Sequence, residues 1–358
     1  MLILVTGFPG FIGKRLVAKL LANDPDARIT AVVEPRMAAH AETVAAEIGD
    51  GRVEVLPGDI ADRRLALASD DYERLIAETE LVYHLAAIYD LAVPIELAQK
   101  VNVEGTGNVL ALCDRCERLE RLHYVSTAYV AGERTGIVYE HELALGQAFK
   151  NHYESTKFQA EVWVREALDR VPATIYRPAI VVGDSRTGET QKFDGPYYML
   201  RSIAVAEQRR MPIAQYGRSE ATFNVVPVDF IVDALAAAPG DPETAGETLH
   251  LVDPQPVAAS EVLALLAHEY AGRGPSYRLP PRLVMRLLRS KRVRDAFAGV
   301  PSEAIRYLNH PVRFDTRRAD ALLERHGLRA PSFEDYVEPI VRFFCDNEDD
   351  PAFRPGAG

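Results

Sequence analysis

Residues 5–13 read VTGFPGFIG and place three glycines at three-residue spacing near the start of the sequence. The apolar run 2–5 before them predicts a buried strand, and apolar residues at helical spacing predict a helix over 11–21. A glycine turn between a strand and a helix directs backbone N–H groups and the positive end of a helix dipole to one point. Because glycine also lets a phosphate approach the backbone closely, the stretch predicts a turn that binds a pyrophosphate.

The pattern of a strand followed by a helix continues through the first half of the sequence. The further strands expected are 28–33, 53–56, 81–85, 122–126 and 173–176, and the further helices are 38–48, 101–116 and 153–168. Repeated units of this kind predict a parallel sheet covered by helices on both faces. Right-handed crossovers make the sheet doubly wound, and such sheets bind ligands at the carboxyl ends of their strands.

The pattern changes after residue 183. The segment 184–198 is polar and irregular and predicts a loop over a site, and helical patterns dominate from 260 onward. We therefore expect an α/β fold, a Rossmann-type doubly wound parallel sheet with a smaller, mostly helical C-terminal substrate-binding cap. The expected parts are a dinucleotide-binding domain of residues 1–183 to which 223–252 return, a cap of 184–222 and 253–350, and a disordered tail of 351–358.

The composition is that of an ordinary globular protein, since 47% of the 358 residues are hydrophobic and 26% are charged. A net charge of −11 argues against a nucleic-acid partner, because a phosphate backbone would be repelled. Three cysteines imply no disulfide framework, and no group of His, Cys, Asp or Glu residues has convincing metal-ligand spacing. The sequence shows no signal peptide and no apolar run of membrane-spanning length, so we expect a cytoplasmic protein without an integral membrane segment.

Candidate catalytic residues occur in two places. Tyr153 and Lys157 share one helix face because they are four positions apart. A tyrosine with its ordinary pKa near 10 is a poor acid–base catalyst at neutral pH, and a cation beside it lowers that pKa by stabilising the phenolate. Ser126 and Thr127 lie at the carboxyl end of an expected strand, where sheets of this kind place their chemistry. We expect Thr127 or Ser126 to orient a substrate carbonyl, Tyr153 to transfer a proton, and Lys157 to tune Tyr153.

Over residues 1–240 these motifs together resemble the extended short-chain dehydrogenase/reductase family. Besides the glycine turn, the matching motifs are Gly58-Asp59-Ile60, His84-Leu85-Ala86-Ala87, Asn102 to Asn108, Ser126-Thr127 with Tyr153 and Lys157, and Arg177-Pro178. The resemblance aligns Thr127 with the family's catalytic Ser/Thr and implies a nicotinamide cofactor. The implied cofactor-binding residues are Thr6, Gly7, Gly10, Phe11, Ile12, Gly13, Asp59, Ile60, Leu85, Ala86, Ala87, Pro178, Tyr153 and Lys157.

Other stretches resemble one branch of that family more closely. Residues 125–132, 183–188 and 226–230 are similar to fatty acyl-CoA reductases and thioester-reductase domains. The resemblance implies hydride transfer between a nicotinamide and the carbonyl or alcohol carbon of a small hydrophobic or acyl-thioester-like substrate. Two alternatives stay open: a nucleotide-sugar epimerase or dehydratase on the same scaffold, and a nucleotide sensor without enzymatic activity. Relatives often dimerise, so a homodimer also stays open.

The choice between NAD(H) and NADP(H) depends on two residues after the second expected strand. Glu34 follows Gly13 by 21 positions, and a carboxylate at about this spacing suits the hydroxyls of an adenosine ribose. It would repel a 2′-phosphate, which favours NAD(H). Arg36 would pair with that phosphate, so NADP(H) stays open.

Residues 281–293 predict a basic amphipathic helix in an otherwise acidic protein. Its cationic residues are Arg282, Arg286, Arg289, Lys291 and Arg292. Such a helix attracts the phosphates of CoA or an anionic membrane surface. The same pattern is equally typical of a cap helix whose basic face is exposed to solvent.

Overall fold

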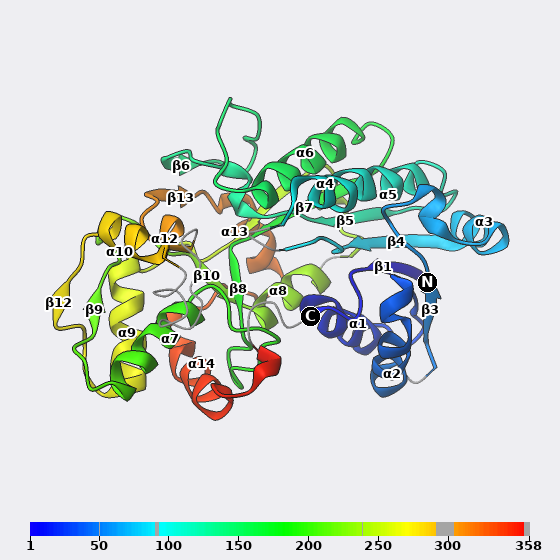
Figure 1. Cartoon of the computed structure of the whole chain (residues 1–358). Coiled ribbons are helices and arrows are strands. Elements are labelled where there is room, and N and C mark those ends of the chain that lie inside the picture. Colours follow the sequence, from blue (N-terminus) through cyan, green and yellow to red (C-terminus); the bar gives the residue numbers. More distant parts are fainter. Residues whose placement is uncertain (50, 90–92, 238, 291–303, 354–358) are drawn as a thin grey trace.

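The computed structural model describes residues 1–49, 51–89, 93–237, 239–290 and 304–353. Its central element is a seven-stranded parallel sheet in the order β11-β7-β5-β4-β1-β2-β3 (Figure 1). The strands are β1 (Leu2–Thr6), β2 (Arg28–Val33), β3 (Val53–Pro57), β4 (Thr79–His84), β5 (Arg121–Val125), β7 (Ala173–Pro178) and β11 (Thr248–Leu251). The expected doubly wound parallel sheet is confirmed.

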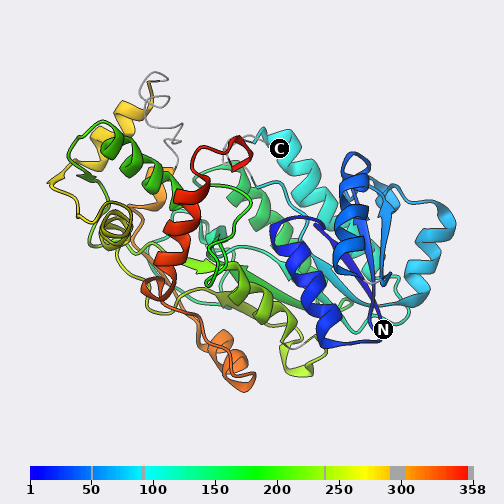
Figure 2. The same cartoon turned by 90° about the horizontal axis from the view of Figure 1, so that it is seen from below.

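Helices cover both faces of the sheet, and each face has its own hydrophobic core. On one face α1 (Phe11–Asn23) and α8 (Val228–Ala236) pack side by side, and α2 (Ala38–Ile48) joins the same core (Figures 1 and 2). The other face carries α3 (Ser69–Glu78), α5 (Gly105–Cys113) and α6 (His152–Glu166). Burial on both faces explains why the strands read as nearly continuous apolar runs.

The strand order places a ligand-binding crevice beside β1. This strand lies between β2 and β4, and the chain leaves it toward α1 but leaves β4 toward the helices of the opposite face. The connections after β1 and β4 therefore diverge, which opens a crevice at the carboxyl ends of these two strands. The glycine turn that follows β1 lies at this point.

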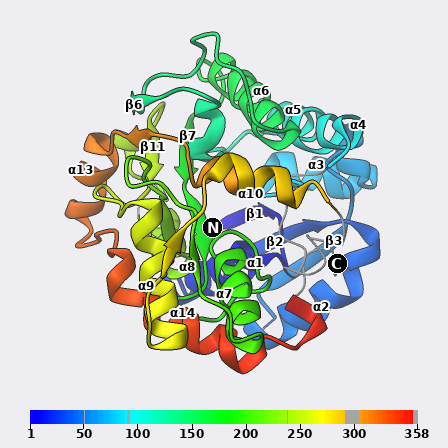
Figure 3. The ribbon, with the colours of Figure 1, turned by 60° about the vertical axis from the view of Figure 1, so that its left-hand side comes forward.

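A third core joins the helices of the second half. It combines side chains of α7 (Tyr197–Gln208), α9 (Ala259–Ala271) and α14 (Phe333–Asn347). The helices α10 (Pro281–Leu288) and α12 (Ala304–Tyr307) lie at the end of the molecule away from β3 (Figure 1), and α10 lies in front when this end is turned forward (Figure 3). The basic amphipathic helix expected at 281–293 is present from Pro281 to Leu288, and Lys291 and Arg292 lie outside the described residues. Three parallel two-stranded pairs complete this region: β8 (Ile180–Val182) with β10 (Val225–Pro227), β9 (Ala214–Gln215) with β12 (Tyr277–Arg278), and β6 (Gly136–Val138) with β13 (Val312–Phe314).

Several elements differ from the expectation. The helices α3 and α7 were not predicted, and α13 (Arg317–Arg325) lies in the region after residue 260 where helices were expected without bounds for this one. The helix expected at 101–116 begins earlier, with α4 (Ile95–Ala98), continues through a π-helical stretch Gln99–Glu104, and ends with α5 at Cys113. Glycines at positions 105 and 107 and the polar Asn102 weaken the helical pattern there, because each is chosen for a tertiary contact rather than for helix propensity.

The first three residues of the expected disordered tail are ordered. Pro351–Phe353 form a short 3-10 helix, and the ring of Phe353 stacks on that of Phe193 with 4.9 Å between centroids. An apolar partner in the third core explains this order. Residues 354–358 lie outside the described residues. Within the described part of the chain, no helix is both long and apolar enough to span a lipid bilayer.

Candidate active site

The glycine turn has the geometry of a phosphate cradle. Gly10 caps the start of α1, and the first bond of that helix runs from the Lys14 N–H to the Gly10 carbonyl. The amides of the first turn therefore have no acceptor inside the helix. A Cβ at Gly13 would lie 2.4 Å from the Gly7 carbonyl oxygen, and Gly7 itself has a φ of +90°. Both positions require glycine, and the turn exposes backbone amides where a pyrophosphate fits.

Thr6, directly before the glycine turn, hydrogen bonds to the end of β4 and to the residues that follow it. Its hydroxyl lies 2.7 Å from Nδ1 of His84 and accepts a hydrogen bond from the Ala86 N–H at 3.3 Å. Nε2 of His84 lies 3.0 Å from the hydroxyl of Thr106. Burial lowers the pKa of His84 to about 3, so its ring is neutral. Thr6 is fully buried and ties β1 to β4, and it is the one predicted cofactor residue that does not line the cavity described below.

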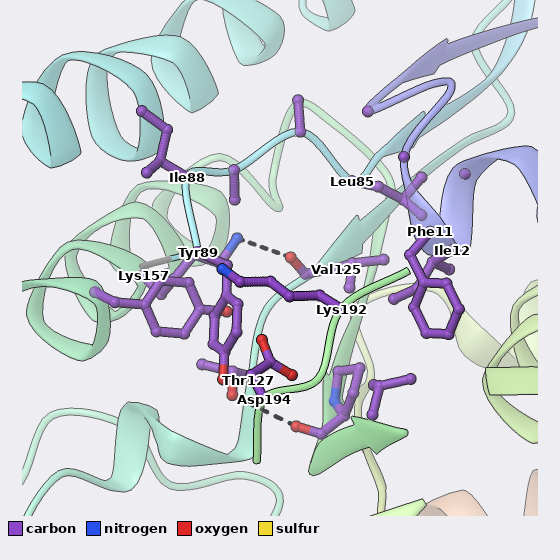
Figure 4. A pocket seen from close by; sticks show the side chains of 18 of the residues that line it. Phe11, Ile12, Leu85, Ile88, Tyr89, Val125, Thr127, Lys157, Lys192 and Asp194 are labelled. Atoms are coloured by element: carbon purple, nitrogen blue, oxygen red, sulfur yellow. Dashed lines mark hydrogen bonds between the residues drawn. The ribbon is translucent and has the colours of Figure 1, made fainter. Parts of the chain in front are cut away.

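A cavity of about 1070 Å³ extends from the glycine turn into the cap (Figure 4). The predicted site residues that line it are Gly7, Gly10, Phe11, Ile12, Gly13, Glu34, Arg36, Asp59, Ile60, Leu85, Ala86, Ala87, Ser126, Thr127, Tyr153, Lys157 and Pro178. They come from the carboxyl ends of β1 to β5 and β7 and from the start of α6. The structure therefore brings the nucleotide motifs and the catalytic motifs into one space.

The two candidate hydroxyls at the end of β5 have different surroundings. Ser126 donates a 2.6 Å hydrogen bond to Oε2 of the buried Glu161. Thr127 donates to the Pro178 carbonyl at 3.4 Å (Figure 4) and accepts from the Tyr129 N–H at 3.3 Å, and its hydroxyl also lowers the pKa of Tyr153. The Thr127 hydroxyl thus acts on the phenol, whereas the Ser126 hydroxyl is bonded to a carboxylate beneath the site.

The pKa of Tyr153 is shifted in the opposite sense to the expectation. Burial and the neighbouring Glu154 carboxylate raise it, while the Thr127 hydroxyl lowers it. The net effect of burial is to lower the pKa of Lys157 to about 7, although the Glu161 carboxylate acts in the opposite direction. The Lys157 ammonium donates to the Val125 carbonyl at 2.8 Å (Figure 4) and lies 4.4 Å from the centroid of the Tyr124 ring. In the protein by itself, the low dielectric surroundings raise the pKa of Tyr153 by more than any lowering by the Lys157 cation.

A buried ion pair supports this group from below. Glu161 receives hydrogen bonds from Arg177 at 2.6 and 3.1 Å and from Arg165 at 3.1 Å, besides the one from Ser126. The Arg177 guanidinium lowers the pKa of Glu161 despite the effect of burial, so the carboxylate is charged. The ion pair joins α6 to β7, and the Ser126 hydrogen bond to the same carboxylate ties the end of β5 to α6, which carries Tyr153 and Lys157.

Glu34 and Arg36 pair with each other at the adenosine end of the cavity. Nε of Arg36 lies 2.7 Å from Oε1 of Glu34, and both side chains are largely exposed. Asp59 lies on the same side, where its carboxylate accepts a hydrogen bond from the Ala61 N–H at 2.8 Å. Arg36, which was expected to bind a 2′-phosphate, is thus paired with Glu34, which was expected to bind the ribose hydroxyls.

The opposite end of the cavity is lined by the cap together with Ile88, Tyr89, Leu97 and Phe223 of the first domain. Its apolar lining residues include Ile88, Tyr89, Leu97, Tyr198, Met199, Tyr216, Phe223, Ile305 and Leu308. Tyr89, Thr127 and Asp194 converge on one part of this space (Figure 4), and Lys192 lies nearby. The net effect of burial is to raise the pKa of Asp194 to about 6, although the Lys192 cation acts in the opposite direction. The segment expected to form a loop over the site thus contributes Thr190, Gln191, Lys192, Asp194 and Gly195 to the cavity.

Sequence reasoning missed most of these cap residues and the role of Glu161. Glu161 follows Lys157 by four positions on α6, so the helical spacing that found Lys157 also reaches it. The signal available in the sequence was therefore a carboxylate on the same helix face as Tyr153 and Lys157. Asp194 and Tyr198 lie in the segment 184–198 that was expected to cover the site, but no motif distinguished them within it, and Tyr216 belongs to another segment that meets them only in the fold.

Comparisons with known proteins identify the family of the chain. Residues 5–235 match the NAD-binding family model described as male sterility protein. Over 95% of its length the chain is 27% identical to an aldehyde reductase of Aspergillus flavus, and it spans 36% of that protein. It is 25% identical over 67% of its length to a fatty acyl-CoA reductase of Drosophila melanogaster, of which it spans 54%.

A solved structure extends the likeness to nearly the whole chain. The terminal R domain of the myxalamid PKS-NRPS biosynthetic pathway superposes with a TM-score of 0.83 and 27% identity, covering 98% of this chain and 92% of that domain. The family match covers well over half of the sequence, and the fold of the R domain includes the cap. The chain belongs to the male sterility protein family, in the reductase-like branch of the extended short-chain dehydrogenases/reductases.

Proposed function

We propose that this protein is an NAD(P)H-dependent reductase of hydrophobic acyl thioesters or the related carbonyl compounds, with Tyr153 as its proton donor. In the thioester reaction the carbonyl carbon gains a hydride, the thiol leaves with a proton, and an aldehyde is formed. The observation that carries the proposal is the convergence of Thr127, Tyr153 and Lys157 on the cavity that begins at the glycine turn.

The residues of the turn fit a dinucleotide. The amides at the start of α1 would hold the pyrophosphate, while Glu34 and Asp59 would bind the adenosine end. Leu85, Ala86, Ala87 and Pro178 line the stretch between the turn and the catalytic residues, where a nicotinamide would lie. When bound, the nicotinamide supplies the hydride.

Tyr153 and Thr127 act on the substrate oxygen. A raised pKa keeps the Tyr153 phenol protonated at neutral pH, so it can donate a proton to the oxygen as negative charge develops there. The Thr127 hydroxyl, which lines the same cavity, orients the same oxygen. Lys157 has a pKa of about 7, so a modest electrostatic change switches it between ammonium and amine. Its positive form stabilises the phenolate that remains after proton transfer.

The cap end of the cavity favours an acyl chain over a nucleotide sugar. A UDP-glucuronic acid 4-epimerase of Bacillus cereus shares the fold with a TM-score of 0.67 at 19% identity, which is evidence of fold alone. A nucleotide sugar requires many hydrogen-bonding partners, whereas the residues of this cavity beyond Tyr153 are mainly aliphatic and aromatic. Such a surface binds a hydrophobic chain through burial of apolar area.

The test is substitution of Tyr153 by Phe, assayed with acyl thioesters, aldehydes and UDP-sugars. We expect a loss of about 10²- to 10⁴-fold in kcat, as for other general acids, with unchanged cofactor binding. Reduction of thioesters by the unsubstituted protein supports the proposal. Near-normal turnover in Tyr153→Phe, or activity toward UDP-sugars only, would contradict it.

We further propose that NAD(H) is the preferred cofactor, because Glu34 stands where a 2′-phosphate would bind and holds Arg36 in an ion pair. Substitution of Glu34 by Ala removes the repulsion and releases the arginine, so the ratio of kcat/KM for NADPH to that for NADH should rise about tenfold. Arg36→Ala is the matched control and should leave the preference for NADH in place. A strong preference for NADPH in the unsubstituted protein would refute this assignment.

A further inference from the structure

The start of α6 holds a buried carboxylate that the proposed proton transfer does not use. Glu154 directly follows Tyr153 and is fully buried, and its carboxylate accepts hydrogen bonds from three groups. The Lys150 N–H donates to Oε2 at 2.9 Å, and the Lys150 ammonium donates to Oε1 at 3.2 Å. The Tyr307 hydroxyl donates to the same Oε1 at 2.7 Å. A buried charge persists only with such partners, so this site is built around the carboxylate.

Tyr307 reaches the carboxylate from the cap. It is the last residue of α12 and lies 153 positions away from Glu154 in the sequence. Its hydroxyl also accepts a hydrogen bond at 2.7 Å from the side-chain amide of Asn151, the residue that caps α6. The phenol of Tyr307 therefore both donates to the first turn of α6 and accepts from it. The same residue lines the catalytic cavity.

The Lys150 ammonium brings a third segment into this group. It lies 5.2 Å from the ring centroid of Tyr307 and 5.8 Å from that of Tyr129, and the two rings meet edge to face at 5.0 Å. Tyr129 follows Thr127 by two positions and also lines the cavity. The wall of the cavity beside Tyr153 thus combines α12, the start of α6 and the residues after β5.

We infer that Tyr307 is a positioning residue of the reaction, which joins the cap to the first turn of α6 and thereby holds Tyr153 in place beside the acyl carbonyl. This inference rests on the proposed reductase function. Tyr153 belongs to the turn that is held, because it lies between Asn151 and Glu154, which both bond to Tyr307. A displacement of about 1 Å at a reacting group can reduce the rate about 100-fold, so the link acts on kcat.

Hydrogen bonds suit this task better than apolar packing does. A buried ion pair contributes little net stability, because the loss of hydration offsets the attraction between the charges. Hydrogen bonds impose a direction, since they weaken steeply away from their preferred distance and angle. Glu154 receives bonds from Lys150 and Tyr307 at once, so a movement of α12 relative to α6 breaks at least one bond. The substrate end of the cavity is thereby held in a fixed relation to the proton donor.

The test is Tyr307→Phe, which keeps the ring and removes both hydrogen bonds of the hydroxyl. The matched control is Tyr270→Phe, because the Tyr270 hydroxyl donates to the Glu348 carboxylate at 2.9 Å but Tyr270 does not line the cavity. Both variants are assayed with a long-chain acyl thioester and titrated with NADH. We expect kcat to fall about tenfold in Tyr307→Phe, with KM for the thioester and affinity for NADH changed less than about twofold.

Asn151 allows a second, independent test. Asn151→Ser keeps a capping oxygen for α6 and removes the amide that bonds to the Tyr307 hydroxyl. It should lower kcat by a smaller factor, because the bond from Tyr307 to Glu154 remains. Combined with Tyr307→Phe it should cause little further loss, since phenylalanine cannot accept that bond. Such non-additivity in kcat is expected of one shared contact and not of two independent effects on folding.

The link is also measured without turnover, by amide hydrogen exchange in a peptide that covers residues 150–157. Tyr307→Phe should speed exchange there about tenfold, and Tyr270→Phe should leave it unchanged. This measurement keeps the inference separate from the proposed function. Absence of thioester reduction by the unsubstituted protein contradicts the function, whereas unchanged exchange in Tyr307→Phe contradicts the inference.

Three kinetic outcomes would overturn the inference as well. The first is an unchanged kcat in Tyr307→Phe, and the second is an equal loss of kcat in Tyr270→Phe. The third is a rise in KM for the thioester at constant kcat, which would make Tyr307 only a contact of the substrate chain.

Discussion

The two ends of the catalytic cavity are built in different ways. At the cofactor end, backbone groups of one short turn and small residues at strand ends form the surface, and glycines leave no room for side chains. At the substrate end, side chains from α4, the loop before α7, α7 itself and α12 form it, with Tyr216 and Phe223 between them. The first surface recognises a constant ligand through backbone geometry, whereas the second is free to vary with the substrate. Damage to either end should therefore produce a distinct defect.

The largest effect is expected at the glycine turn. In Gly13→Ala the new Cβ would lie 2.4 Å from the Gly7 carbonyl oxygen, so the turn has to move. We expect cofactor affinity to fall about 100-fold, or about 2.7 kcal/mol, as measured by titration with NADH. Gly274→Ala is the control, because no atom lies within 4 Å of a Cβ there. Equal NADH affinity in Gly13→Ala would show that the turn is not the phosphate cradle.

The next effect concerns the loss of folding stability in acid, which we expect to come from buried histidines of the sheet. Burial lowers the pKa of His123 to about 3, against an ordinary value of 6.5. The unfolded chain therefore binds more protons between these two pH values, so stability falls as the pH falls from 6.5 toward 3. His84 and His250 in the same sheet have pKa values of about 3 for the same reason.

Each of these histidines should add about 1.4 kcal/mol per pH unit to the slope of unfolding free energy in that window. Urea unfolding of His123→Gln between pH 4 and 6 should show a slope reduced by about that amount. The exposed His326 gives the control variant, His326→Gln, whose slope should match the unsubstituted protein. Identical slopes in all three proteins would refute the assignment to buried histidines.

A smaller effect is expected at the substrate end. Leu97 lines the cavity but is 46% exposed, so Leu97→Ala should barely affect folding. Losing its apolar contact should raise KM for a long-chain acyl thioester about tenfold, since burying such a side chain is worth roughly 1.5 kcal/mol or more. KM for NADH should not change. Leu145, which is 59% exposed and does not line the cavity, gives the control Leu145→Ala. A change in KM for NADH would mean that the two ends are not separable.

The sequence by itself was sufficient to locate the glycine turn and most strands of the sheet. The strands of the sheet follow from runs of apolar residues, and the turn at 5–13 follows from three glycines whose spacing is local. Tyr153 and Lys157 were found for the same reason, because helical spacing relates them directly. Such features depend on neighbours along the chain, and a periodic pattern records them.

Only the tertiary structure decided the rest. It separated Thr127 from Ser126 by pairing Ser126 with Glu161, placed Thr6 behind the turn, and made Arg36 a partner of Glu34. It also raised the pKa of Tyr153 where a lower one was expected, because burial acts on a phenol whatever its neighbours in sequence. The apolar end of the cavity and the hydrogen bonds between Tyr307 and the start of α6 exist only where segments far apart in the chain meet. Local patterns determine elements and backbone turns, whereas the environment of a side chain depends on contacts that no spacing along the sequence encodes.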